Sequence, residues 1–155
     1  MQQTDKSWYN FRKYAGVDRF ASYFHQLDES LALKPASILE VGVGDHVFGN
    51  YISKNTDIRY ESLDVANDLS PTHLGSIEKM PLPDSSYDVV CAFEVLEHLP
   101  FEKFSTALSE LARVSKRNVI ISIPHFGPPL KLSFKLPFLP EIKLAWKFPF
   151  AKPHT

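Results

Sequence analysis

The sequence is poor in cysteine and in long hydrophobic runs. Cys91 is the one cysteine in 155 residues, which excludes a disulfide framework, and its apolar neighbours favour burial over reactivity. No stretch approaches the length that spans a bilayer, and the first residues, MQQTDK, lack the apolar core of a signal peptide. These absences predict a cytoplasmic protein.

The chain also lacks a strong overall charge, with a net value of −1. Residues 1–124 hold 12 Lys and Arg against 17 Asp and Glu, whereas residues 125–155 hold five lysines, one acid and six of the 12 prolines. The length is that of a single domain. We predict a core with an N-terminal helical flap over 1–124 and a basic, proline- and aromatic-rich tail or lid over 125–155. The acidic body argues against a nucleic-acid substrate.

Hydrophobic periodicity predicts strands that alternate with helices. An amphipathic helix over 18–31, capped by Asp18, has its apolar residues at spacings of three and four: Phe20, Tyr23, Phe24, Leu27 and Leu31. An aromatic cluster precedes it as a short helix or flap: Trp8, Tyr9, Phe11 and Tyr14. Further helices are expected over 45–54 (capped by Asp45), 94–98 and 101–115, and strands over 37–41, 58–64, 73–77, 87–93 and 119–123. This alternation predicts an α/β fold with a doubly wound, mostly parallel sheet.

The glycine-rich turn after the first predicted strand is the clearest sign of a ligand site. Residues 37–46, SILEVGVGDH, bring an apolar run to Glu40 and then to Gly42 and Gly44. Glycine permits strained backbone angles and a close approach of a ligand, and the helix that follows offers free amides to a carboxylate or phosphate. A tight strand-to-helix turn also favours glycine without any ligand, so the turn alone leaves both interpretations open.

Three acids follow predicted strands: Glu40, Asp64 and Glu94. The carboxyl ends of parallel strands share one edge of the sheet, and ligands bind there. Asp64 lies 24 residues beyond Glu40, a separation that suits a carboxylate binding the two hydroxyls of a ribose. Aspartate is also common at strand ends, but together with the glycine turn it favours ribose binding.

Four stretches together resemble the class I S-adenosylmethionine-dependent methyltransferases, the type that includes ubiquinone-biosynthesis O-methyltransferases. They are ILEVGVG at 38–44, SLDV at 62–65, GSIEKMPLPDSSYDVV at 75–90 and FEVLEHL at 93–99. The resemblance covers about residues 36–124 and implies a Rossmann-like core with S-adenosylmethionine as its cofactor. A nicotinamide-dependent dehydrogenase is the alternative, but Val47 stands where its fingerprint requires glycine.

The resemblance implies nine cofactor-binding residues: Glu40, Gly42, Gly44, Asp64, Val65, Ser76, Ile77, Phe93 and Glu94. Glu40, Gly42 and Gly44 would hold the methionine part of the cofactor, and Asp64 would hold the ribose. Val65, Ser76 and Ile77 would contact the adenine. Phe93 and Glu94 would flank the methionyl arm. Two positions depart from the family: His46 stands at its third glycine, and Ser76 stands where an acid is frequent.

Methyl transfer requires alignment of the acceptor and, for a hydroxyl or thiol, a base. If 94–98 is α-helical, Glu94, Glu97 and His98 share one face, which makes His98, with Glu97, the candidate base. Local pairing of Glu97 and packing of His98 would explain the same residues without catalysis. The three side chains could alternatively bind a divalent cation, with His125 as a further ligand.

After the fifth strand the family usually adds two more strands, whereas this sequence continues with a proline-punctuated segment. We therefore expect the last two strands to be lacking and the fifth strand to be an open edge, where a second copy could pair. Residues 130–150 alternate lysines with aromatic residues, as in a lid or peripheral membrane segment, or in a loop that buries its aromatic side chains.

These patterns predict a methyltransferase for a small-molecule or lipid-like acceptor. The alternative is a catalytically silent module that binds the cofactor or a protein partner.

Overall fold

The computed structural model describes residues 6–9, 11–124, 129–134 and 142–147. The chain divides into two compact units, residues 1–123 and 124–155. In the second unit, β6 (Pro129–Phe134) pairs antiparallel with β7 (Ile142–Lys147). His125 and the side chains of 130–150 lie outside the described residues, so the predictions made for them stay predictions.

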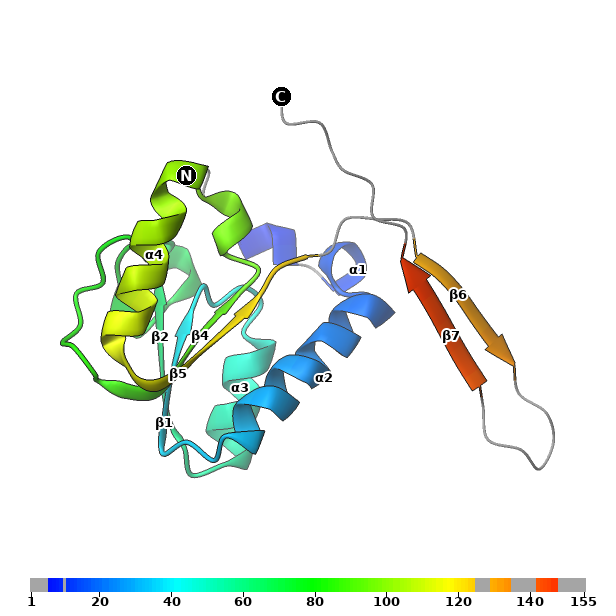
Figure 1. Cartoon of the computed structure of the whole chain (residues 1–155), viewed down its shortest axis with the longest axis horizontal. Helices are drawn as coiled ribbons and strands as arrows, with labels where there is room; N and C mark the ends of the chain where they lie inside the picture. The colour runs from blue at the N-terminus through cyan, green and yellow to red at the C-terminus, as the bar shows by residue number, and fades with distance from the viewer. Residues whose placement is uncertain (1–5, 10, 125–128, 135–141, 148–155) are drawn as a thin grey trace. The chain divides into compact units, whose positions relative to one another are not determined.

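The first unit is built on a fully parallel sheet of five strands in the order β3-β2-β1-β4-β5 (Figure 1). The strands are β1 (Ser37–Val41), β2 (Arg59–Asp64), β3 (His73–Leu74), β4 (Tyr87–Phe93) and β5 (Ser115–Ser122). All of β1 is buried, and so is β4 up to its last residue. Both strands are apolar without alternation because helices cover both faces of the sheet. The predicted doubly wound α/β fold is confirmed.

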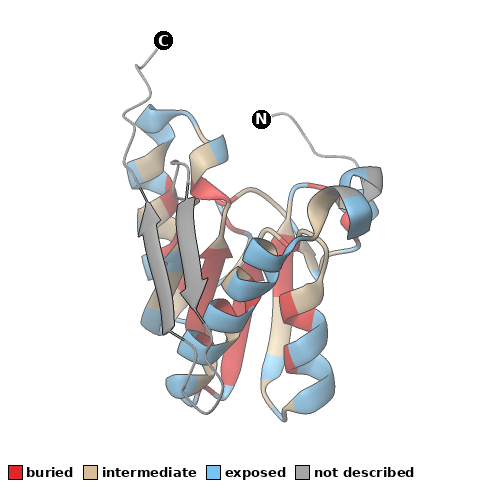
Figure 2. Cartoon of the chain, turned by 90° about the vertical axis from the view of Figure 1, so that its right-hand side faces the viewer, coloured by how far each residue is buried: buried red, intermediate tan, exposed pale blue. Residues whose placement is uncertain are grey.

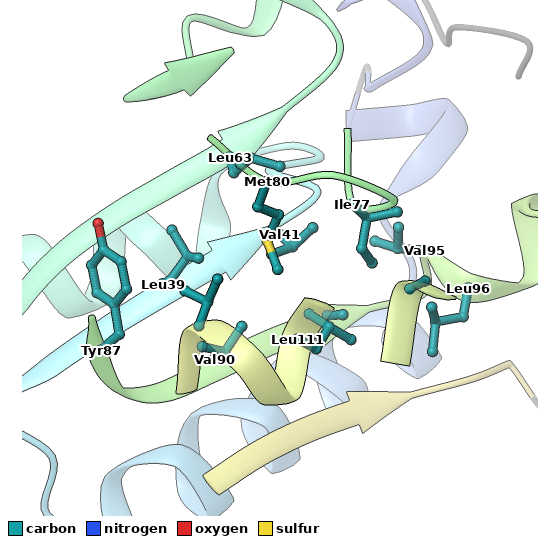
Figure 3. Packing of buried hydrophobic residues seen from close by; sticks show 13 residues of the cluster. Leu39, Val41, Leu63, Ile77, Met80, Tyr87, Val90, Val95, Leu96 and Leu111 are labelled. Atoms are coloured by element: carbon teal, nitrogen blue, oxygen red, sulfur yellow. The ribbon is translucent and has the colours of Figure 1, made fainter. Parts of the chain in front are cut away.

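Helices α2 (Val17–Ala32) and α3 (Val47–Asn55) cover one face of the sheet, and α4 (Phe101–Val114) covers the other (Figure 1). Ile38, Val89 and Cys91 face α3 in one apolar cluster. Leu39 and Val90 belong to the larger cluster under α4, which Figure 3 shows from close by. Figure 2 shows the result, with the central strands buried and the outer faces of the helices exposed. Among the described residues, no helix combines the length and the apolar character of a membrane span.

Several element ends differ from the sequence prediction. Asp18 lies in the first turn of α2 and does not cap it, because Gly16 occupies the N-cap position. Helix α3 begins at Val47, and Asp45 accepts a hydrogen bond from the Val47 amide at 3.3 Å. Strand β3 has two residues. Strand β5 begins at Ser115, directly after α4, since its polar first half pairs with β4 while remaining largely exposed.

The buried face of α2 is more polar than its periodicity indicates. Phe20 and Phe24 are 48% and 64% exposed, whereas Tyr23, Gln26 and Ser30 are buried. The amino end of α2 lies at the carboxyl ends of the strands, because its other end leads into the start of β1. Polar side chains are therefore brought to the edge of the sheet where the glycine turn lies.

Candidate cofactor site

The turn between β1 and α3 has the left-handed backbone that its glycines allow. Gly42 and Gly44 have φ values of +85° and +49°. A Cβ at Gly42 would overlap the Val95 side chain, so the turn is also sterically closed there. His46 has a φ of +64°, so the residue at the family's third glycine keeps the backbone conformation that favours glycine.

Asp64 is hydrogen-bonded to this turn. Its Oδ2 accepts a hydrogen bond from the Val43 amide at 2.9 Å, and its Oδ1 accepts one from the Ala66 amide at 2.8 Å. A carboxylate has about four acceptor positions, so each oxygen keeps capacity for a further donor. Asp64 is thus held in a fixed orientation with the capacity that two ribose hydroxyls require.

Glu40 is a buried acid at the end of β1, 4% exposed. The Tyr60 hydroxyl donates a hydrogen bond to its Oε2, and Gly49 makes room for that hydroxyl, because a Cβ there would overlap the Tyr60 ring. Burial raises the pKa of Glu40 to about 8, with Asp45 and Asp64 adding to the increase. A cationic group placed beside Glu40 would favour its charged form.

An N-terminal cover, defined here as Tyr9, Tyr14, Arg19 and Tyr23, lies over the glycine turn. Tyr9 and Tyr14 come from the short elements η1 (Lys6–Tyr9) and α1 (Phe11–Tyr14), and their rings meet edge to face at 4.8 Å. Tyr9 also packs against Val43. The expected short helical elements are therefore present, and they pack beside the turn.

Two polar contacts fasten this cover to the carboxyl edge of the sheet. The Tyr23 hydroxyl donates to Asp45 Oδ2 at 2.6 Å. Arg19 Nη1 forms an ion pair with Glu94 Oε2, and its guanidinium carbon lies 4.3 Å from the centre of the Tyr14 ring. Cover and turn together line a partly open cavity of about 30 Å³, which is space for about two water molecules. The described residues that line it are Tyr14, Arg19, Tyr23, Gln26, Glu40, Gly42, Val43, Gly44, Asp45, Phe48 and Phe93.

The site has a negative electrostatic character. Burial raises the pKa of the Tyr9 hydroxyl, and the charges of Asp64 and Asp45 raise it further. The pKa of Tyr14 rises to about 12 for the same main reason, burial. The charges of Asp64 and Asp45 thus reach the cover, with Arg19 opposing them, and these carboxylates suit a ligand that carries positive charge.

The predicted adenine side is only partly open. Val65 is 39% exposed beside Asp64, whereas Ile77 is 3% exposed and packs in the core. Ser76 Oγ accepts a hydrogen bond from the Glu78 amide at 3.2 Å. Val65 therefore offers a surface to a flat ring, while a contact from Ile77 would have to come from its backbone.

The structure does not form the α-helical face expected for residues 94–98. Glu94 has a φ of +55°, and η3 (Leu96–His98) is a 3₁₀ helix, in which side chains repeat every three residues. Within the described part of the chain, no three His, Cys, Asp or Glu side chains are placed to hold a metal ion. The premise of the metal alternative, a shared face for Glu94, Glu97 and His98, is therefore wrong.

Glu97 and His98 differ in their surroundings. His98 is exposed. One oxygen of Glu97, Oε2, is buried without a hydrogen-bond partner among the described residues, and burial raises the pKa of this carboxyl. Glu94 lies close enough to Glu97 to raise its pKa further.

Sequence reasoning placed Tyr9 and Tyr14 in a short helix or flap, but it did not assign Arg19, Tyr23 or Tyr60 to the site. The apolar periodicity of 18–31 drew attention to its large hydrophobic residues, and no motif pointed to Arg19. A usable signal was present, since Tyr23, Gln26 and Ser30 follow helical spacing. A polar stripe on a helix beside a glycine turn indicates a face that meets a site.

Comparison with known proteins gives a consistent assignment. A family model described as a methyltransferase domain matches residues 38–123. A comparison with curated protein sequences gives no significant match.

Three solved structures illustrate the similarity of the fold. A putative S-adenosyl-L-methionine-dependent methyltransferase from Methanococcus maripaludis aligns with a TM-score of 0.54 and 15% identity, over 77% of this chain and 66% of that one. A SAM-dependent methyltransferase from Aquifex aeolicus gives 0.51 and 25%, over 74% and 69%. A putative sarcosine dimethylglycine methyltransferase from Galdieria sulphuraria gives 0.53 and 20%, over 76% and 47%.

The aligned part spans less than half of the Galdieria chain and about two thirds of the other two. The matched domain nevertheless contains the glycine turn, Asp64, β4 and η3, all within residues 38–123. The chain belongs to the class I S-adenosylmethionine-dependent methyltransferase family.

Proposed function

We propose that this protein transfers a methyl group from S-adenosylmethionine to a small-molecule or lipid-like acceptor. The observation that carries the proposal is the attachment of Asp64 to the glycine turn through the Val43 amide. This hydrogen bond joins Asp64, the predicted ribose-binding residue, to the glycine turn, the predicted methionine-binding part of the site. Both are therefore held in place together.

The residues at the turn fit the cofactor of the family. Asp64 would hold the ribose through its two oxygens, with Val65 beside the adenine. Glu40, Gly42 and Gly44 would hold the methionyl part, with Phe93 beside it. The cofactor supplies a methyl group that its positively charged sulfur activates, and the negative character of the site favours that charge.

Charge distribution supports a small or lipid-like acceptor over a nucleic acid. Residues 1–124 carry 12 basic against 17 acidic side chains, and the site itself is surrounded by carboxylates, which repel phosphates. The Galdieria protein is named for small methylated amino acids, sarcosine and dimethylglycine. A compact acceptor that does not carry phosphate is therefore the class that we propose.

We assign the role of general base to Glu97 when the acceptor requires one. A base operates best when its pKa lies near the working pH, and burial moves Glu97 in that direction. Its free, buried oxygen can accept a proton, whereas His98 is exposed to solvent. Glu97 replaces His98 as the leading candidate.

The proposal is tested first by binding. Asp64→Asn keeps the shape of the side chain but removes its charge, so the affinity for S-adenosylhomocysteine should fall at least about tenfold in titration calorimetry, since hydrogen bonds to charged groups are the strong ones. Asp57→Asn makes the same chemical change at an exposed residue just before β2, and it should bind like the wild type. Wild-type protein that gives no binding heat would contradict the proposal.

Transfer is tested second, with tritium-labelled methyl cofactor and pools of hydroxyl, thiol, amine and carboxylate acceptors. Label should appear in at least one pool of small or lipid-like molecules. Binding without transfer to any pool would instead favour a silent cofactor-binding module.

A further inference from the structure

The cavity beside the glycine turn has two acidic side chains and one cationic side chain among its described lining residues. Glu40 and Asp45 are acidic, and Arg19 is cationic. We propose that Arg19 binds the carboxylate of the methionyl part of the cofactor. This assignment rests on the proposed function and adds a residue that no sequence motif indicates.

The usual anion site of such folds, the N-terminus of the helix after the turn, already faces a carboxylate of this chain, that of Asp45. The Val47 amide donates to Asp45 Oδ1 at 3.3 Å, and the His46 amide donates to the Val43 carbonyl at 2.9 Å. The Asp45 carboxylate therefore stands at the start of α3, where a negative charge is favourable. A second carboxylate at that place would meet the charge of Asp45, so the ligand's carboxylate needs a cation elsewhere.

Arg19 has the geometry for this role. Its guanidinium stacks on Tyr14 at 4.3 Å, and its side chain is 24% exposed, so the position of the group is restricted. A guanidinium offers five N–H donors in a planar fork that matches a carboxylate. The ion pair with Glu94 engages Nη1, and Arg19 can turn its fork from Glu94 towards a ligand or bind both.

The charges around the cavity match those of an amino acid. The ammonium and the carboxylate of an amino acid are attached to the same carbon, so a site that binds both must bring acid and base close together. Glu40 and Asp45 provide acceptors for the ammonium, and Arg19 faces the same cavity with its donors. The nucleoside part of the cofactor has no such requirement, and its binding should not depend on Arg19.

The experiment compares two ligands that differ by the amino-acid part. S-adenosylhomocysteine carries it, whereas 5′-methylthioadenosine has the same nucleoside without it. In calorimetry, Arg19→Gln should weaken S-adenosylhomocysteine about 10- to 100-fold, the effect of removing hydrogen bonds to a charged group. The affinity for 5′-methylthioadenosine should stay within about twofold of the wild type. Arg117→Gln removes the same charge at an exposed residue near the amino end of β5 and should change neither affinity.

Each outcome decides the proposal. Equal S-adenosylhomocysteine affinity in Arg19→Gln and wild type would overturn it, and so would an equal loss for both ligands, which would indicate a general effect on the cover. If Arg19→Gln does not fold, Arg19→Lys, which keeps the charge without the fork, takes its place under the same criterion. Wild-type protein that binds 5′-methylthioadenosine but gains nothing from the amino-acid part would overturn the Arg19 assignment alone. Wild-type protein that binds neither ligand would overturn the proposed function with it.

Discussion

At the amino ends of the central strands, the Asp88 carboxylate accepts hydrogen bonds from the Ala36 and Ser37 amides at 2.8 and 3.1 Å. At the carboxyl ends, Glu40 lies buried against the Tyr60 hydroxyl. Backbone hydrogen bonds lower the pKa of Asp88, whereas burial raises the pKa of Glu40 to about 8. The Asp88 carboxylate links β4 to the start of β1. The Glu40 carboxyl is buried beside a cavity, where its charged form is unfavourable.

Positive φ values occur at both ends of the central strands. Lys34 and Ser85 precede β1 and β4, and four residues at the carboxyl edge share this conformation: Gly42, Gly44, His46 and Glu94. Such conformations cost free energy and persist where the surrounding structure fixes them, which is typical of binding sites. The carboxyl edge thus departs from what stability alone would favour, and the following predictions measure how far.

The largest effect is expected at Glu97. Glu97→Gln removes the proposed base, so the rate of methyl transfer to a hydroxyl or thiol acceptor should fall about 10²- to 10⁴-fold. The KM for the cofactor should stay within about twofold, because the proton transfer belongs to the chemical step. Steady-state kinetics with the acceptor found by labelling measures both.

Two further variants test this prediction, one as a control and one for the competing assignment. Glu102→Gln changes an exposed acid in the first turn of α4 and should leave the rate unaltered. A larger loss in His98→Gln than in Glu97→Gln would return the role to His98, as the sequence first indicated.

A smaller effect, on stability, is expected at the glycine turn. Gly42→Ala places a side chain at a φ of +85° and against Val95, so the free energy of unfolding should fall by about 2–4 kcal/mol. Gly44→Ala shares the positive φ, but its Cβ would lie 3.8 Å from the Tyr9 ring, and it should lose only about 1–2 kcal/mol. Urea denaturation measures both, and equal losses would show that contact with Val95 is unimportant.

The smallest effects are expected from pH, measured as the change in the free energy of unfolding per pH unit. Because the folded chain holds the Glu40 proton more tightly than the unfolded chain, wild-type stability should fall as the pH rises from about 4.5 towards 8. The fall is at most about 1.4 kcal/mol per pH unit. Glu40→Gln keeps an acceptor for Tyr60 but cannot ionise, so it should remove this fall.

Asp88 should show the opposite sign. Its pKa is lowered from 3.8 in the folded chain, so it stabilises the fold above that pH and loses this contribution in acid. Asp88→Asn should therefore be less stable than the wild type at pH 7, by a difference that shrinks as the pH falls. Urea denaturation from pH 3 to 8 compares the two variants, and slopes of the same sign would contradict the contrast drawn between the two ends.

Much of the fold could be predicted from local pattern. The bounds of β1 and β4 were predicted correctly because a strand buried on both faces is mostly apolar without alternation. Strand β5 was placed four residues late, since its first half is polar and only pairing with β4 makes it a strand. The 3₁₀ geometry of η3 was missed because a five-residue segment does not distinguish the two helix types by spacing.

The sequence by itself determined the parallel sheet, the glycine turn and the placement of Glu40 and Asp64 at one edge, because these follow from periodicity and strand order. Only the tertiary structure decided that Arg19, Tyr14 and Tyr23 close over that edge, that Tyr60 meets Glu40, and that Glu97 is sheltered while His98 is not. Those contacts join residues far apart in the chain, and a local pattern carries no record of which distant side chain will fill a given space.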